Sequence, residues 1–92
     1  MKQIGWMLGW RYGRWPKMTY DFFPDTRPDG TVASYGYFDR HGVLHENLDA
    51  GCRAQLELDD LANGTEKAGG LVVHSVCFPV HAPEGFDAAD DI

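Results

Sequence analysis

Residues 3–12 alternate between large apolar and small or polar side chains more regularly than any other stretch of the chain. One face of this segment collects the large side chains Ile4, Trp6, Leu8, Trp10 and Tyr12. A period of two residues is typical of a β-strand. The opposite face carries Gly5 and Gly9, and glycines in a strand let a neighbouring backbone or ring approach closely. The segment therefore predicts a strand that packs differently on its two faces.

Two hairpins are predicted around turn signals. Residues 17–23 follow a turn at 13–16 and form an antiparallel partner for the first strand. Residues 31–39 and 43–48 are β-branched and aromatic runs joined by the tight connection Arg40-His41-Gly42. The expected fold is therefore mainly β, a small antiparallel sheet or meander of about five to six strands.

Two later segments decide how the sheet is completed. Residues 71–80 are apolar on both faces, which favours a central strand whose pairing is limited at Pro79. Residues 49–63 are rich in helix formers and end in Asn63-Gly64, a signal for the end of a helix. Within them, however, four apolar side chains alternate with polar ones: Cys52, Ala54, Leu56 and Leu58. We therefore expect a strand with one helical turn at 60–63; a short helix within 49–63, giving an α+β fold, is the alternative.

The core must be built from a limited supply of apolar side chains. The chain has 92 residues, which suits one domain, and Leu, Ile, Val and Phe together number 20. Because an aromatic ring buries roughly 150–250 Å², we expect the three Trp and four Tyr residues to complete the core. We expect residues 1–81 to form a single β-rich domain. Residues 82–92 contain four acids and little to bury, and predict an acidic, mobile tail.

No residue pattern indicates catalysis, a metal site or a cofactor. His41 and His45 lack the second pair of ligands that zinc needs at a recognisable spacing. His74 and Ser75 are neighbours on a predicted strand, so their side chains point to opposite faces and cannot form a base and nucleophile pair. The two cysteines indicate reduced thiols of a cytoplasmic protein, and the N-terminal apolar run is too short to span a membrane. We expect a protein that is not an enzyme and has no catalytic residue, metal, cofactor or membrane association.

A resemblance to a known family covers residues 37–54. An aromatic strand, a Gly turn, a Leu-His step and a small-residue segment follow one another as Tyr37-Phe38-Asp39-Arg40-His41-Gly42-Val43-Leu44-His45 and then Asp49-Ala50-Gly51-Cys52-Arg53-Ala54. This order resembles one copy of a MORN-like repeat, although members usually carry tandem copies and a proline where this chain has Arg53. The resemblance implies a β-meander without catalytic activity, and the Leu-His step implies that His45 orders the turn.

Charge is distributed unevenly along the chain. Residues 1–20 carry four cations and no acid, whereas residues 46–92 carry ten acids and two cations, and the whole chain has a net charge of −6. An acidic majority disfavours binding to a phosphate backbone and favours a basic partner.

These charges lead to the main functional hypothesis, a non-enzymatic inhibitor that occludes a basic, nucleic-acid-binding surface of a partner such as an effector or nuclease. Carboxylates in rows can imitate a phosphate backbone and occupy a Lys/Arg groove. The residues expected to do so are Glu57, Asp59, Asp60, Glu66, Glu84 and Asp87. In general type, such a protein resembles small phage-encoded inhibitors of bacterial defence nucleases, anti-CRISPR proteins included, which act in the host cytoplasm. It also resembles toxin-immunity proteins, which inhibit their partners in a similar way.

The alternative is a single-stranded nucleic-acid binder that uses the first hairpin. Aromatic rings for stacking and cations for phosphate contacts are interleaved there: Trp10, Arg11, Tyr12, Arg14, Trp15 and Lys17. The net charge of −6 opposes this alternative. The glycine-spaced face of residues 3–12 is also compatible with the interface of a homodimer.

Overall fold

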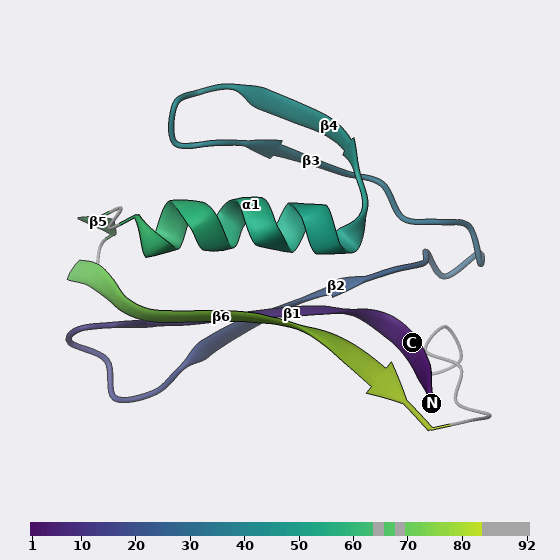
Figure 1. The fold of residues 1–92 in the computed structure, drawn as a ribbon, viewed down its shortest axis with the longest axis horizontal. Coiled ribbons are helices and arrows are strands. Elements are labelled where there is room, and N and C mark those ends of the chain that lie inside the picture. Colours follow the sequence, from purple (N-terminus) through teal and green to yellow (C-terminus); the bar gives the residue numbers. More distant parts are fainter. Residues whose placement is uncertain (64–65, 68–69, 84–92) are drawn as a thin grey trace.

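The computed structural model describes residues 1–63, 66–67 and 70–83. The elements in chain order are β1 (Lys2–Tyr12), β2 (Thr19–Pro24), β3 (Tyr35–Phe38), β4 (Leu44–Leu48), α1 (Ala50–Ala62), β5 (Glu66–Lys67) and β6 (Gly70–Ala82). They form a four-stranded antiparallel sheet in the order β2-β1-β6-β5 and a separate antiparallel hairpin of β3 and β4. Figure 1 shows α1 between the sheet and the hairpin. The predicted mainly β fold is confirmed, in the form that contains a helix.

β1 is the strand on which the sheet is built. It pairs with β2 on one side and with β6 on the other, so that Trp6 lies opposite both Phe23 and Pro79. Its large side chains face α1, where Leu8 is fully buried. The predicted alternation of faces and the first hairpin are therefore confirmed.

The opposite face of β1 carries Gly5 and Gly9, and two rings of β2 fold over them. A Cβ atom at Gly5 would lie 2.6 Å from the ring of Phe22, and one at Gly9 would lie 2.6 Å from the ring of Tyr20. Because the two glycines have no side chain, the rings of Phe22 and Tyr20 can pack directly on the backbone of β1.

β6 extends further than the sequence predicts. It continues through Pro79 to Ala82, which is buried, and pairs with β1 along most of its length. β5 pairs only with its first two residues, so from Val72 onward the outer edge of β6 has no partner strand among the described residues. Proline is tolerated on such an edge, which explains why pairing does not stop at Pro79. The expected acidic tail lies, from residue 84, outside the described residues.

The strand expected in the first part of 49–63 is wrong, because these residues form α1. Asp49 caps the helix by accepting a hydrogen bond from the backbone N–H of Cys52 at 2.8 Å. The buried side chains of the helix are Ala50, Ala54 and Leu61. They are spaced by four and seven residues, which places them on one side of the helix. The buried stripe thus combines Ala54, one of the four alternating side chains, with Ala50 and Leu61 from outside that set.

Small side chains let α1 lie close to the sheet. A Cβ atom at Gly51 would lie 2.9 Å from the indole of Trp6, so glycine is needed where the helix crosses that ring. Ala33 is buried as well, in the connection between β2 and β3. The core is therefore made largely of Ala and Leu, with the aromatic rings of β1 half-buried around it.

The second hairpin is present but shorter than predicted, because β3 begins at Tyr35 and not near residue 31. Its turn uses Gly42 with a φ of 79°, a left-handed conformation that glycine adopts without strain. The MORN-like resemblance covers this hairpin, whereas residues 50–54 that follow it are helical and do not enter a further strand.

Replacing Gly5 should destabilise the fold, whereas replacing Gly36 should not. A Cβ atom at Gly5 would lie 2.5 Å from the backbone oxygen of Phe23, and one at Gly36 would meet its nearest atom at 3.6 Å. We expect Gly5→Ala to lower the free energy of unfolding by about 1–3 kcal/mol and Gly36→Ala to leave it unchanged or raise it by up to about 1 kcal/mol. Urea denaturation followed by circular dichroism measures both, and equal stabilities would contradict the close packing at Gly5.

Candidate binding site

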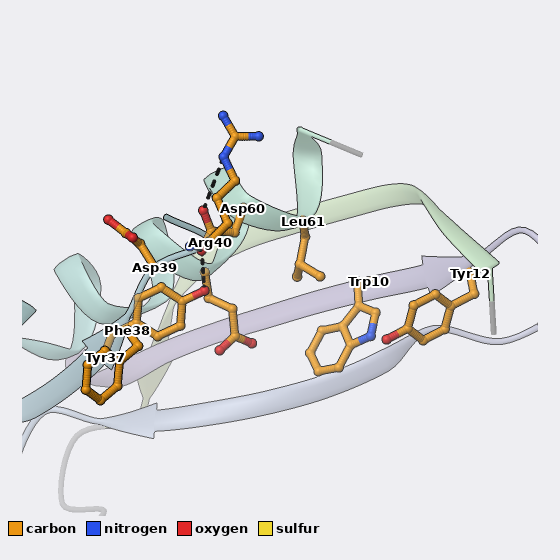
Figure 2. Close-up of a pocket in the computed structure, with 9 residues that line it drawn as sticks. Trp10, Tyr12, Tyr37, Phe38, Asp39, Arg40, Asp60 and Leu61 are labelled. Atoms are coloured by element: carbon orange, nitrogen blue, oxygen red, sulfur yellow. Dashed lines mark hydrogen bonds and ion pairs between the residues drawn. The ribbon is translucent and has the colours of Figure 1, made fainter. Parts of the chain in front are cut away.

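A pocket of about 380 Å³ opens between α1, the end of β1 and the second hairpin. Four aromatic rings line it: Trp10 and Tyr12 from β1, and Tyr37 and Phe38 from β3. Three carboxylates and a guanidinium complete the polar lining: Asp39, Glu57, Asp60 and Arg40. Figure 2 shows these side chains around the pocket, with Leu61 beside Trp10. The site therefore combines apolar rings with a local excess of negative charge.

Asp60 joins α1 to the hairpin. Its Oδ2 atom accepts hydrogen bonds from the hydroxyl of Tyr37 at 2.6 Å and from the backbone N–H of Arg40 at 3.0 Å. The Nε atom of Arg40 lies 4.0 Å from Oδ1, and the Asp60 side chain is only 16% exposed. Burial, together with the hydrogen bond to Asp60, raises the pKa of Tyr37 above its ordinary value. Tyr37 therefore remains protonated and serves as a donor at neutral pH.

Arg53 lies on the helix side of Tyr37 and is held by rings and a carboxylate together. Its guanidinium carbon is 4.3 Å from the centre of the Tyr37 ring and 4.9 Å from that of Phe23. Its Nη1 atom donates to Oε1 of Glu57 at 2.7 Å, one helical turn further along α1. The molecule thus already binds one guanidinium between aromatic rings and a carboxylate, next to the pocket.

Asp39 organises the turn that forms the rim of the pocket. Its carboxylate accepts hydrogen bonds from the backbone N–H groups of His41 and Val43, each at 2.9 Å, and lies 2.9 Å from Nε2 of His45. The hydrogen bond with His45, followed by that from Val43, lowers the pKa of Asp39. His45 therefore contacts the turn, in the position that the Leu-His step implies.

Trp10 brings a polar atom that the protein leaves without a partner. Its Nε1–H is buried and makes no hydrogen bond within the described part of the chain. Figure 2 shows the ring nitrogen on the side of Trp10 that is turned toward Tyr12. A buried donor without an acceptor costs roughly 1–3 kcal/mol, so a change in the Trp10 side chain that gave this N–H an acceptor would be favourable.

Of the six predicted acidic residues, the structure describes the side chains of the three on α1, and these differ in their surroundings. Glu57 and Asp60 line the pocket, each bound to a side chain of the protein itself. Asp59 is exposed on the helix and accepts a hydrogen bond from Gln55. Glu66 lies in β5, and Glu84 and Asp87 lie outside the described residues.

The aromatic and basic residues of the first hairpin are divided between two faces. Trp10 and Tyr12 face the helix side and line the pocket, whereas Arg11 follows on the opposite face of β1. The remaining three lie in the turn between β1 and β2: Arg14, Trp15 and Lys17. Trp15 is 53% exposed and borders a shallow hollow with Tyr12 and Lys17. The structure therefore does not bring all six of these residues to one face.

The sequence did not indicate a binding role for four residues of the site: Tyr37, Phe38, Asp39 and Arg40. They belong to the turn segment in which the sequence indicates only structure. Their role depends on the position of α1, and a helix was only the alternative prediction for residues 49–63.

The described part of the chain contains neither a cluster of metal ligands nor a membrane-spanning helix. Among residues 1–63, 66–67 and 70–83, no group of three or more His, Cys, Asp or Glu side chains is placed to hold a metal ion. Within the same ranges, no helix is long and apolar enough to cross a membrane.

Comparison of the chain with protein-family models, with curated proteins and with solved structures finds no match. The site must therefore be interpreted from its own geometry.

Removing the Tyr37 hydroxyl should loosen the hairpin from the helix. Because Asp60 is largely buried and loses its shortest hydrogen bond, we expect Tyr37→Phe to lower the free energy of unfolding by about 1.5–3 kcal/mol. Tyr20→Phe removes the same atom from an exposed ring and should change stability by less than about 0.5 kcal/mol. Chemical denaturation of both variants checks the difference, and a neutral Tyr37→Phe would show that the Asp60 bond does not hold the layers together.

The hydrogen bonds that Asp39 accepts in the turn should make the stability of the fold depend on pH. Because the pKa of Asp39 is lowered from 3.8 in the folded protein, its contribution is complete above that value and is lost as the pH falls through the folded pKa. We expect Asp39→Asn to be less stable than the unmodified protein at pH 7, with the gap shrinking below about pH 3.8. Thermal melts from pH 7 to pH 2 measure the gap, with the exposed Asp21→Asn as control; a gap independent of pH would contradict this role.

Proposed function

We propose that this protein is a non-enzymatic binding module that captures an arginine-bearing segment of a basic partner protein in the pocket between α1 and the second hairpin. The observation that carries the proposal is the meeting of four aromatic rings with three carboxylates in one concave site. Arginine matches that composition better than lysine, because its planar guanidinium stacks on rings and pairs with carboxylates at the same time.

Arg53 supports the proposal from within the chain. It binds between Tyr37 and Phe23 while pairing with Glu57, and the pocket offers the same kinds of group a short distance away. A guanidinium entering from outside meets the ring of Phe38, which is 66% exposed, and the negative field of Asp39 and Asp60. Carboxylates accept several hydrogen bonds each, so internal partners do not prevent them from attracting a further cation.

Trp10 adds a reason to expect a peptide and not a free cation. Its Nε1–H is buried and has no acceptor within the described part of the chain, and a turn of the Trp10 side chain toward the pocket would let the backbone carbonyl beside an arginine side chain accept from it. The captured segment would then be held at two points, by its side chain and by its main chain. Such a module covers the basic surface that it binds, and this is how it would inhibit a nucleic-acid-binding effector or nuclease.

A second candidate, single-stranded nucleic-acid binding, depends on the turn between β1 and β2. The exposed ring of Trp15 lines a shallow hollow together with Tyr12 and Lys17. One exposed ring with neighbouring cations gives a weaker stacking surface than the row expected from the sequence. The test below therefore includes an oligonucleotide.

Binding of an arginine-rich peptide at low salt should be saturable and should disappear when every arginine is replaced by its neutral isostere citrulline. We expect Phe38→Ala to weaken binding about fivefold, which corresponds to about 1 kcal/mol of cation–π attraction. Asp59→Asn, which removes a carboxylate of α1 outside the pocket, should weaken it less. Isothermal titration calorimetry measures the affinity of the arginine-rich peptide for the unmodified protein, for Phe38→Ala and for Asp59→Asn.

Two results would overturn the proposal. One is equal binding of the arginine and citrulline peptides. The other is saturable binding of a single-stranded oligonucleotide that Arg14→Glu with Lys17→Glu abolishes, while the arginine peptide does not bind.

A further inference from the structure

The three carboxylates of the pocket are largely buried, whereas one of its rings is open to solvent. The side chains of Asp39 and Asp60 are each 16% exposed, and that of Glu57 is 20% exposed. Phe38, which lines the same pocket, is 66% exposed. A ligand in the pocket therefore contacts aromatic surface directly and meets the carboxylates mainly through their electric field.

The same carboxylates already have partners inside the protein. Asp39 accepts two hydrogen bonds from the backbone of its own turn and lies 2.9 Å from the ring of His45. Asp60 accepts two hydrogen bonds from the second hairpin, and Glu57 accepts one from Arg53. A ligand must therefore share these acceptors with the protein for every hydrogen bond that it makes to them.

Methylation changes an arginine in a way that suits such a pocket. Methyl groups keep the positive charge of the guanidinium, but they remove N–H donors and block bidentate pairing with a carboxylate. Where a ligand arginine forms such a pair with a free carboxylate, methylation removes part of the binding energy. In this pocket the pair would compete with bonds that the carboxylates already make, whereas added methyl groups would bury apolar surface against the rings.

We propose that the pocket between α1 and the second hairpin prefers arginine in its methylated form, as asymmetric dimethylarginine, over unmodified arginine. The inference rests on the proposed function, because it names the form of arginine that the same site takes. The pocket volume of about 380 Å³ leaves room for two methyl groups beside a guanidinium, since each is about the size of a water molecule, roughly 30 Å³. Trimethyl-lysine also keeps its charge without N–H donors, but it has no planar group to stack on a ring.

The test titrates the full chain calorimetrically with three forms of one arginine-rich peptide. The arginines are unmodified in the first form, asymmetric dimethylarginine in the second and citrulline in the third. We expect the dimethylarginine peptide to bind at least about threefold more tightly than the unmodified peptide, and the citrulline peptide not to bind. Added salt should weaken binding of both charged peptides but leave the preference between them, because salt screens the field and not the ring contacts.

Two variants test whether the rings of the pocket cause the preference. Phe38→Ala removes the most exposed of the four rings and should reduce the difference between the two charged peptides to less than about twofold. Trp15→Ala removes an exposed ring that does not line this pocket and should leave the preference unchanged. Circular dichroism confirms that both variants are folded.

The outcomes separate this inference from the proposed function. If the unmodified peptide binds and the dimethylarginine peptide binds equally or more weakly, the inference is overturned and the proposed function stands. If neither charged peptide binds, both are overturned. A folded Phe38→Ala variant that keeps the full preference also overturns the inference, and so does a trimethyl-lysine peptide that binds more tightly than the dimethylarginine peptide.

Discussion

The close approach of α1 to β1 determines most of what this small domain contains. The helix buries Ala50 and Ala54 against the sheet and passes the indole of Trp6 at Gly51. Large side chains in these positions would lift the helix and leave Leu8 without cover. A chain with few aliphatic residues thus obtains a dense core by short distances instead of large side chains, and the rings displaced from the centre become available at the surface.

The second hairpin depends on the position of that helix. It has no large buried side chain of its own, and it is held to α1 by the hydrogen bonds of Asp60 and by Arg53 against the Tyr37 ring. These polar contacts leave a pocket beside them, because two layers joined at a few points do not fill the space between them. The candidate site is therefore a consequence of how the third layer is attached.

The sequence predicts the parts of this structure that depend on neighbouring residues. The alternation of β1 is visible because its period is local, and the turn of the second hairpin is visible because Gly42 and its flanking strands are adjacent. The helix was only the alternative prediction for residues 49–63, because its buried stripe consists mainly of alanines, whose hydrophobic signal is weak beside the alternation that includes Leu56 and Leu58. The site was missed for a related reason, since Tyr37 and Asp60 meet only once the helix is in place.

The same limit applies to charge. Asp60 and Glu57 belong to an acidic stretch of sequence that indicates a solvated surface, yet both are turned toward groups of the protein itself. Asp59, their neighbour, remains exposed. Sequence position therefore fixes the sign of the local field but not which carboxylates face a ligand.

Pro79 has a consequence for how the protein avoids uncontrolled assembly. It lies in β6 where the outer edge of that strand has no partner within residues 1–63, 66–67 and 70–83, and an open edge is a template on which further strands can add without limit. Proline has no N–H to contribute to such a ladder, and its ring obstructs an incoming backbone. Addition of further strands at this edge is thereby discouraged. The face of the sheet that α1 leaves uncovered (Figure 1) is then better suited than this edge to contacts of defined size.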